Sequence, residues 1–288
     1  MTPVRLTTLF TIVFTQYIMR YAVLLPIIRS LGFEFQLSNF TFLCLVFSTI
    51  CIAAAGLIKE RKTITIHIIL FFAGILLGIY VIIKAGVPNL ILTYIALAII
   101  LLLYLFVYRH HFLVGNIIVA LFFAIVPIMV LLDILPIYRV YGRLLLQMNV
   151  NFDFVIYWIS GVSTFIFLNV LSCEIIKDTE DFENDNVTCD SRSFPFIMGA
   201  PNAKLTIIGI NTANIVILSL MFSFLLSSIA GLFSFLYILL LLIIPILYIN
   251  WKVHKAIVGN DYRHIGNIMK IILLVGIAYS GVLWWYAL

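Results

Sequence analysis

One acidic stretch lies between two long apolar segments of the chain: Glu174-Ile-Ile-Lys-Asp-Thr-Glu-Asp-Phe-Glu-Asn-Asp-Asn-Val-Thr-Cys-Asp-Ser-Arg-Ser-Phe-Pro195. Each flanking segment is long enough to cross a bilayer. The stretch holds seven of the chain's 12 acidic residues, namely Glu174, Asp178, Glu180, Asp181, Glu183, Asp185 and Asp190. Because the acidic residues are concentrated at one place, this stretch is the first candidate for a functional site.

Four of these acids share one face if the stretch continues the preceding helix. Glu174, Asp178, Asp181 and Asp185 then lie within about 60° of one another at 3.6 residues per turn. Carboxylates at this spacing repel one another unless a cation lies among them. Oxygen ligands favour Mg²⁺ or Ca²⁺ over zinc, and Mg²⁺ is commonly held by one or two carboxylates together with substrate phosphates. The pattern therefore predicts a metal site, with a solvated acidic loop as the alternative.

Two basic residues of the same stretch, Lys177 and Arg192, are suited to bind a phosphate beside such a metal. The four cysteines of the chain contain no CxxC pair, so the sequence suggests neither a zinc site nor a disulfide framework.

The composition indicates an integral membrane protein. Hydrophobic residues make up 64% of the 288-residue chain and charged residues 10%, whereas a soluble domain carries about 25% charged residues. We therefore expect an all-α integral membrane protein that forms a single domain over 1–288. Apolar runs predict nine transmembrane helices, at about 6–28, 39–58, 64–83, 89–108, 113–135, 153–173, 204–227, 231–250 and 266–287. The longest connection on the outer side is expected between Asp133 and Asp153.

The basic residues predict the orientation of these spans. With nine spans, 12 basic residues fall on the side of the amino terminus and four (Arg29, Lys84, Arg139 and Arg143) on the other. Cytoplasmic loops carry the excess of Lys and Arg in membrane proteins. The amino terminus and the acidic stretch are therefore expected to face the cytoplasm, and the location is predicted to be a bacterial cytoplasmic (inner) membrane.

Several polar residues lie inside the predicted spans. Arg20 is in the middle of the first span, where an unpaired charge costs about 2.5 to 3.5 kcal/mol or more, so it should face a partner or a wet cavity. Snorkelling toward one end of the helix is the alternative. Asn169, Asn211 and Asn214 are expected to form hydrogen bonds between helices.

A second polar group lies where the fourth span ends and the fifth begins. It consists of Tyr104, Arg109 and Asn116, within the segment from Tyr104 to Asn116. Taken by itself, this group has the composition of an ordinary cytoplasmic turn.

These segments together resemble the UbiA superfamily of intramembrane prenyltransferases, within its geranylgeranylglycerol-phosphate geranylgeranyltransferase-like branch. The run from Glu174 to Asp185 is similar to the second Asp-rich motif of the family, and Ser191-Arg-Ser-Phe-Pro195 is similar to the Arg-Thr-Leu-Pro segment that follows it. Gly115-Asn-Ile-Ile-Val-Ala120 resembles the family's Gly-Asn-x-x-Val-Ala. Tyr104 and Arg109 resemble its Tyr/Lys pair, with Arg in place of Lys.

The resemblance implies a helical bundle around a central cavity. In that cavity Mg²⁺ would bind a polyprenyl diphosphate, and the prenyl chain would pass to a lipid or aromatic acceptor within the membrane. The implied partners are this donor, the acceptor and the lipid bilayer, and no nucleic acid. The resemblance assigns catalysis and Mg²⁺ binding to Asp178, Asp181 and Asp185, and substrate binding to Lys177, Arg192, Arg109, Tyr104 and Asn116.

One departure from the family supports an alternative function. The first Asp-rich motif, of the type Asn-Asp-x-x-Asp-x-x-x-Asp, should follow Ala53-Ala-Ala-Gly56, but the chain passes from Leu57-Ile58 directly to Lys59-Glu-Arg-Lys-Thr63. This reads as an internal deletion. The alternative is therefore a catalytically degenerate paralogue that binds isoprenoid lipid or diphosphate without turnover. A small-solute transporter is a more distant third, because paired spans broken by Gly or Pro are not evident.

Overall fold

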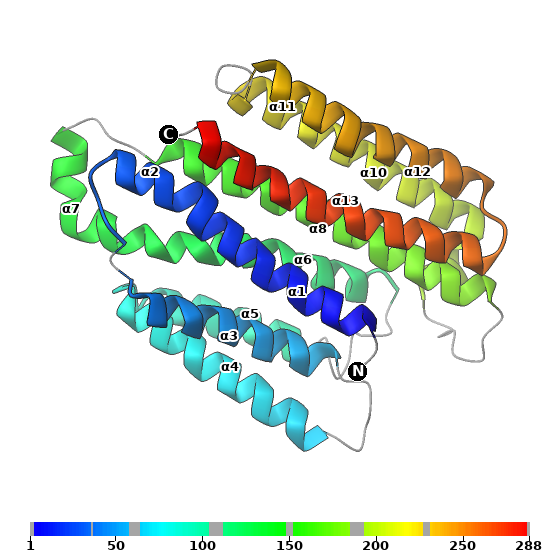
Figure 1. Ribbon diagram of the computed structural model, residues 1–288. Helices are drawn as coiled ribbons and strands as arrows, with labels where there is room; N and C mark the ends of the chain where they lie inside the picture. Colours follow the sequence, from blue (N-terminus) through cyan, green and yellow to red (C-terminus); the bar gives the residue numbers. More distant parts are fainter. Residues whose placement is uncertain are drawn as a thin grey trace. The chain divides into compact units, whose positions relative to one another are not determined.

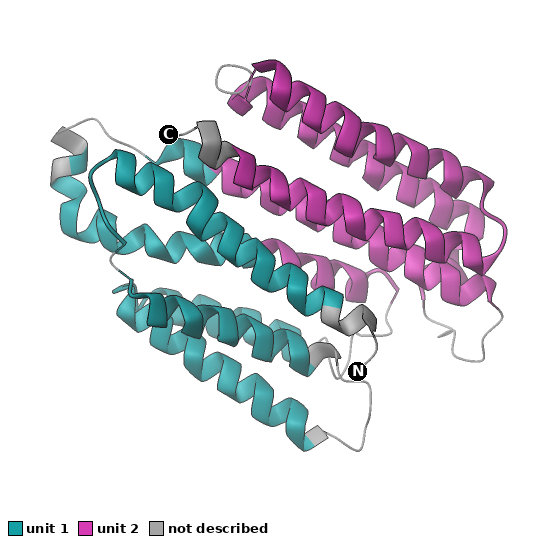
Figure 2. Cartoon of the chain, in the orientation of Figure 1, with its two compact units in different colours: residues 1–105, 126–156, 287–288 teal, residues 106–125, 157–286 magenta. Residues whose placement is uncertain are grey.

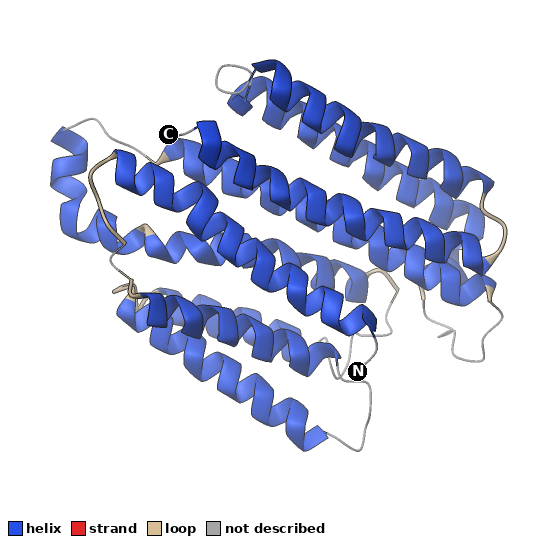
Figure 3. Ribbon diagram, in the orientation of Figure 1, coloured by secondary structure: helices blue, strands red, loops and turns tan. Residues whose placement is uncertain are grey.

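The computed structural model describes residues 3–35, 37–57, 64–103, 112–147, 152–184, 193–226 and 231–286. These ranges are almost entirely helical and contain no β-strand (Figure 3). Within them, seven helices are long and apolar enough to cross a membrane: Thr7–Ser30, Thr65–Lys84, Val114–Arg143, Asp153–Glu183, Ala200–Leu226, Gly231–Lys255 and Gly259–Val282. The expected all-α membrane fold is confirmed. Helices overlap all nine predicted spans, but Asn39–Ala55 and Leu90–Leu103 are shorter, so the count of nine stays a prediction.

The chain forms two compact units, coloured separately in Figure 2. Unit 1 comprises Met1–Leu105, Val126–Ile156 and Ala287–Leu288, and unit 2 comprises Phe106–Ile125 and Tyr157–Tyr286. The single domain expected over 1–288 stays a prediction.

Unit 1 contains the first five helices of the chain and the segment around α7. Its elements are α1 (Pro3–Ile18), η1 (Met19–Leu24), α2 (Leu25–Ser30), α3 (Asn39–Leu57), α4 (Ile64–Lys84), α5 (Leu90–Leu103), η4 (Val130–Asp133) and α7 (Leu135–Gln147), with the end of α6 (Val114–Met129). α3 and α4 pack closely, and the Ser48 hydroxyl of α3 donates a hydrogen bond of 2.7 Å to the carbonyl of Gly74 in α4. The prediction of a loop between Asp133 and Asp153 was wrong, because most of this connection is helix α7.

Unit 2 contains the start of α6, α8 from Tyr157 onward and the elements that follow α8. They are α8 (Asp153–Glu183), α9 (Phe194–Met198), α10 (Ala200–Met221), η5 (Phe222–Leu226), α11 (Gly231–Tyr237), η6 (Ile238–Ile243), α12 (Ile244–Lys255) and α13 (Gly259–Tyr286) (Figure 1). α8 and α13 lie side by side, with the Trp158 indole N–H donating to the Ser280 hydroxyl at 3.2 Å.

Proline explains two wide turns in these helices. Pro26 and Pro245 each lack a backbone N–H and would clash with the carbonyl four residues earlier in a regular α-helix. The turn before each proline is instead a π-helix. The Leu25 N–H bonds the Arg20 carbonyl, and the Ile244 N–H bonds the Leu239 carbonyl, both five residues back. Each of these π-helices therefore accommodates the proline that follows it, whereas Pro127 lies inside α6 without a π-helical turn.

A buried ion pair lies inside unit 1. The Arg20 guanidinium Nε is 3.2 Å from the Asp133 carboxylate, and the two side chains are 0% and 2% exposed. The Nη2 atom of Arg20 also donates to the Leu37 carbonyl at 3.0 Å. The rings of Phe42 and Phe35 lie 4.2 and 4.5 Å from the guanidinium carbon. Arg20 therefore faces a partner inside the fold and does not reach toward an end of the helix.

A second polar network joins three helices of unit 2. Asn211 of α10 accepts a hydrogen bond from the Ser172 hydroxyl of α8 and donates one to Asn250 of α12, each at 2.9 Å. Asn211 thus makes the interhelical bonds expected from the sequence. Asn214 is fully buried as well, yet neither its amide oxygen nor its amide nitrogen has a hydrogen-bond partner.

Candidate functional site

The acidic face of α8 exists as the sequence suggested. Because α8 continues to Glu183, Glu174, Asp178 and Asp181 are on one continuous helix. Their spacing keeps them on one side of that helix, with Asp178 in the middle. Asp185, the fourth acid of the predicted face, lies outside the described residues.

Asp178 is held by a residue 62 positions earlier in the chain. The Asn116 side-chain amide, in the first turn of α6, donates a hydrogen bond of 2.8 Å to Oδ2 of Asp178. Asn116 is only 8% exposed and Asp178 is half-buried. The bond fixes one carboxylate oxygen, which leaves the other for a further ligand. Two residues selected separately from the sequence therefore meet at one point in unit 2.

The backbone beside this pair is also joined across the chain. Phe112 and Ser193 form an isolated parallel bridge, and the rings of Phe112 and Phe194 lie 5.1 Å apart. Phe112 has a φ of 35°, a left-handed conformation that is uncommon for a residue with a bulky side chain. Such conformations persist where the surroundings impose them, and they cluster at functional sites. The segments that lead into α6 and α9 are thus fixed against each other near Asn116.

Two ion pairs flank Asp178 on α8. Lys177 lies 3.5 Å from Glu174 one turn earlier, with both side chains partly exposed. Glu180 accepts a hydrogen bond of 2.8 Å from Nε of Arg263 on α13. Glu174 and Glu180 therefore have cationic partners already. Asp181 has none among the described residues and is exposed.

The donor set suits a hard cation, although the described residues alone do not enclose one. Within them no group of three His, Cys, Asp or Glu side chains converges on a common point. Asp178 and Asp181 nevertheless supply carboxylate oxygens from one helix face, and Mg²⁺ commonly takes only one or two protein carboxylates beside substrate oxygens and water. Asp178, with one oxygen fixed and the other open, has the chemistry of such a ligand.

Four of the predicted site residues lie outside the described part of the chain: Tyr104, Arg109, Asp185 and Arg192. Residues 58–63, where the first Asp-rich motif of the family would follow the second span, also lie outside it. The proposed roles of these residues, and the proposed deletion, stay predictions.

Two residues that shape this site could not be identified from sequence patterns. Arg263 binds Glu180 from a helix 83 positions later, and the sequence patterns there gave no reason to pair the two. No sequence pattern indicates Phe112, because its contribution is a backbone conformation and a bridge to Ser193. For Asn116 the signal was its place in the Gly115-Asn116 motif, whereas Asp178 was indicated by the spacing of the acidic residues.

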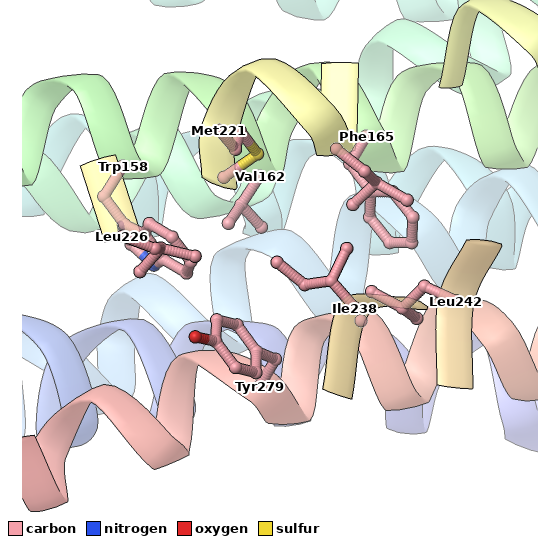
Figure 4. Close-up of a pocket in the computed structure, with 10 residues that line it drawn as sticks. Trp158, Val162, Phe165, Met221, Leu226, Ile238, Leu242 and Tyr279 are labelled. Carbon is pink, nitrogen blue, oxygen red and sulfur yellow. The ribbon is translucent and has the colours of Figure 1, made fainter. Parts of the chain in front are cut away.

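Unit 2 also encloses a small apolar cavity, shown in Figure 4. It measures about 20 Å³ and lies among Trp158, Phe165, Met221, Ile238 and Tyr279, together with neighbouring aliphatic side chains. This is the scale of one water molecule, and apolar cavities of that kind stay dry. The cavity is therefore a packing defect and is much too small to hold an isoprenoid chain.

Comparison with known proteins gave one relative of similar sequence and one of similar fold. The chain is 24% identical over 224 residues to a digeranylgeranylglyceryl phosphate synthase of Methanosphaera stadtmanae, covering 77% of this chain and 71% of that protein. The structure of a UbiA homolog from Aeropyrum pernix K1, solved in its apo form, matches with a TM-score of 0.62 and 12% identity, covering 98% of both chains. No protein-family model matches the sequence.

Proposed function

We propose that this chain is an intramembrane prenyltransferase, as its sequence likeness to a digeranylgeranylglyceryl phosphate synthase and its fold likeness to a UbiA homolog suggest. It transfers the prenyl chain of a polyprenyl diphosphate to an acceptor held in the membrane. The single observation that carries the proposal is the hydrogen bond between Asn116 and Asp178. It joins the Gly-Asn segment and the acidic segment, the two parts of the chain that most resemble the family.

The acidic face of α8 is where the diphosphate would bind. Asp178 and Asp181 would hold Mg²⁺, with Asp185 as a third ligand. When bound, the metal supplies positive charge that stabilises the diphosphate leaving group. Asn116 orients Asp178 for this role, because its amide occupies one carboxylate oxygen. Glu174 takes no direct part in the proposal, since Lys177 lies beside it.

Basic residues complete the proposed diphosphate site. Lys177 is exposed on α8 one residue before Asp178, and Arg192 and Arg109 are assigned the same role by the resemblance. Both arginines lie outside the described residues, so this assignment rests on the resemblance alone. Tyr104 and Asn116 would line the cavity that holds the prenyl chain.

The sequence relative suggests the acceptor. Its name describes a protein that makes digeranylgeranylglyceryl phosphate. A lipid that carries glyceryl phosphate is therefore the first acceptor to test for this chain, with an aromatic acceptor as the alternative. The acidic face of α8 is proposed to open toward the cytoplasm, on the side predicted to carry most of the basic residues.

The experiment that tests the proposal measures pyrophosphate release by the purified full-length protein. Geranylgeranyl diphosphate is the donor, geranylgeranylglyceryl phosphate the acceptor, and Mg²⁺ is present. We expect release by the native chain and its loss in Asp178→Asn. The matched control is Asp153→Asn, which removes the same charge in the first turn of α8, at its other end.

Each outcome separates the two functions raised by the sequence. Release that survives Asp153→Asn and disappears in Asp178→Asn supports prenyl transfer at the acidic face. If the native chain binds the donor but releases no pyrophosphate with any acceptor, it is a non-catalytic paralogue. Equal loss in both variants would mean that Asp178 has no specific role.

A further inference from the structure

A basic hollow lies at the turn between α12 and α13, at the same end of unit 2 as the acidic part of α8. Its volume is about 610 Å³. Its lining includes Trp251, Lys252, Lys255, Asn260, Asp261 and Asn267. Neither the proposed prenyl transfer nor the resemblance to the family uses any of these residues.

The charge of the hollow is predominantly positive. Asp261 is its one acidic side chain, and its Oδ2 atom accepts hydrogen bonds from the backbone N–H groups of Ile257 and Val258, at 3.1 and 3.3 Å. Arg263 binds Glu180 of α8. Lys252 and Lys255 belong to no ion pair among the described residues, although the charge of Lys252 also acts on the Asp261 carboxylate. The Lys255 ammonium, and in part that of Lys252, is therefore able to attract an anion.

The two lysines are held in place by aromatic rings. The Lys255 ammonium lies 4.2 Å from the ring centre of Trp251, and the Lys252 ammonium lies 5.5 Å from that of Tyr248. Such contacts restrict the side chains while leaving the charge able to meet a further partner. Both ammonium groups therefore lie within cation–π distance of an aromatic ring.

The turn itself is fixed from three directions. The Lys204 ammonium of α10 donates a hydrogen bond of 2.6 Å to the Ala256 carbonyl. The Asp261 carboxylate holds the next two amides, as described above. At Gly259 even a Cβ atom would overlap the Asn184 side chain at the end of α8. The turn between α12 and α13 therefore has a fixed conformation, and the hollow beside it is already present in unit 2.

Apolar side chains surround the hollow. Ile257 and Val258 at the tip of the turn are 77% and 58% exposed, and Trp251 is 53% exposed. Trp, Tyr and Lys near the ends of membrane helices are typical of the bilayer interface, where the rings lie at the level of the lipid head groups. This position favours an anion that is attached to a lipid.

We propose that the hollow between α12 and α13 binds the phosphate of an anionic membrane lipid. Lys252 and Lys255 would contact the phosphate oxygens, Asn260 and Asn267 can donate further hydrogen bonds, and Ile257 and Val258 would insert among the acyl chains. The proposal concerns binding only. It is independent of prenyl transfer, so either can fail without the other.

The test uses native mass spectrometry of the detergent-solubilised full-length protein with dioleoyl phosphatidic acid. Dioleoyl phosphatidylcholine is the zwitterionic comparison, and inorganic phosphate is the comparison for a free anion. We expect retention of phosphatidic acid over phosphatidylcholine, and no displacement by millimolar phosphate. In Lys252→Gln/Lys255→Gln, affinity for phosphatidic acid should fall about 25-fold, because each lysine near an anionic lipid contributes about fivefold.

The matched control is Lys84→Gln/Arg143→Gln, which removes two exposed positive charges from unit 1. Its affinity should equal that of the native chain. Lys255→Gln alone gives a second reading, about fivefold, should the double variant unfold. Equal loss in the control, or undiminished retention in the lysine variants, would overturn the proposal. Displacement by inorganic phosphate would overturn it too, since the hollow would then select a free anion.

Discussion

The buried pair of Arg20 and Asp133 offers the sharpest test of how unit 1 is stabilised. The perturbation is Asp133→Asn, which keeps the shape of the side chain and removes its charge. Arg20 would then be a fully buried cation without a counter-ion, since its side chain is 0% exposed. Removing one partner of a buried pair costs about 3 to 5 kcal/mol.

The structure favours the lower part of that range. Arg20 keeps its hydrogen bond to the Leu37 carbonyl and its contacts with the rings of Phe35 and Phe42. Each cation–π contact contributes about 0.5 to 2 kcal/mol, more where water is excluded. We therefore expect Asp133→Asn to reduce the free energy of unfolding by about 3 kcal/mol. At about 2 °C per kcal/mol for a chain of this size, Tm should fall by about 6 °C.

The assay is thermal unfolding in detergent, followed by the reaction of a dye with newly exposed thiols. Cys44 is buried and Cys51 and Cys173 are half-buried, so they report unfolding. Lys84→Gln, an exposed basic residue of the same unit, is the control and should shift Tm by less than about 1 °C.

A double-mutant cycle separates the ion pair from its surroundings. Arg20→Met/Asp133→Leu replaces both charges by apolar side chains, and such replacements are often neutral or stabilising. The double variant should therefore be more stable than Asp133→Asn. The reasoning is refuted if Asp133→Asn unfolds at the native temperature, or if the double variant costs as much as the single variants Arg20→Met and Asp133→Leu added together.

Three further predictions concern unit 2. Asn116→Leu removes the donor to Asp178 and should lower pyrophosphate release at least tenfold, because a charge-assisted hydrogen bond contributes about 1.5 to 3 kcal/mol; unchanged release would show that Asp178 needs no orientation. Gly276→Ala places a Cβ atom where it overlaps the Phe165 ring, so it should destabilise the protein by about 1 to 3 kcal/mol. Gly209→Ala is the control, because no atom lies within 4 Å of its Cβ, and thermal unfolding should show no destabilisation. Removing divalent cations with EDTA should abolish pyrophosphate release, and added Mg²⁺ should restore it; release that persists in EDTA would contradict the assignment of carboxylates as metal ligands.

The acidic face of α8 is a feature that residue spacing alone could predict. The spacing of Glu174, Asp178 and Asp181 places them together on any helix that continues this far, and α8 does continue. The residues between Asp133 and Asp153 led to the wrong prediction of a loop. Their turn-forming and charged residues also suit an amphipathic helix, and α7 is such a helix.

The sequence by itself determined the membrane class, the positions of the apolar spans and the face shared by the acids. It could do so because a backbone in lipid must satisfy its hydrogen bonds within each segment, which makes helix formation a local matter. Only the tertiary structure decided which polar groups meet. Arg20 required a partner, but its choice of Asp133, like that of Asn116 for Asp178, depends on how separate helices pack. Such pairings join residues far apart in the chain, and no local spacing encodes them.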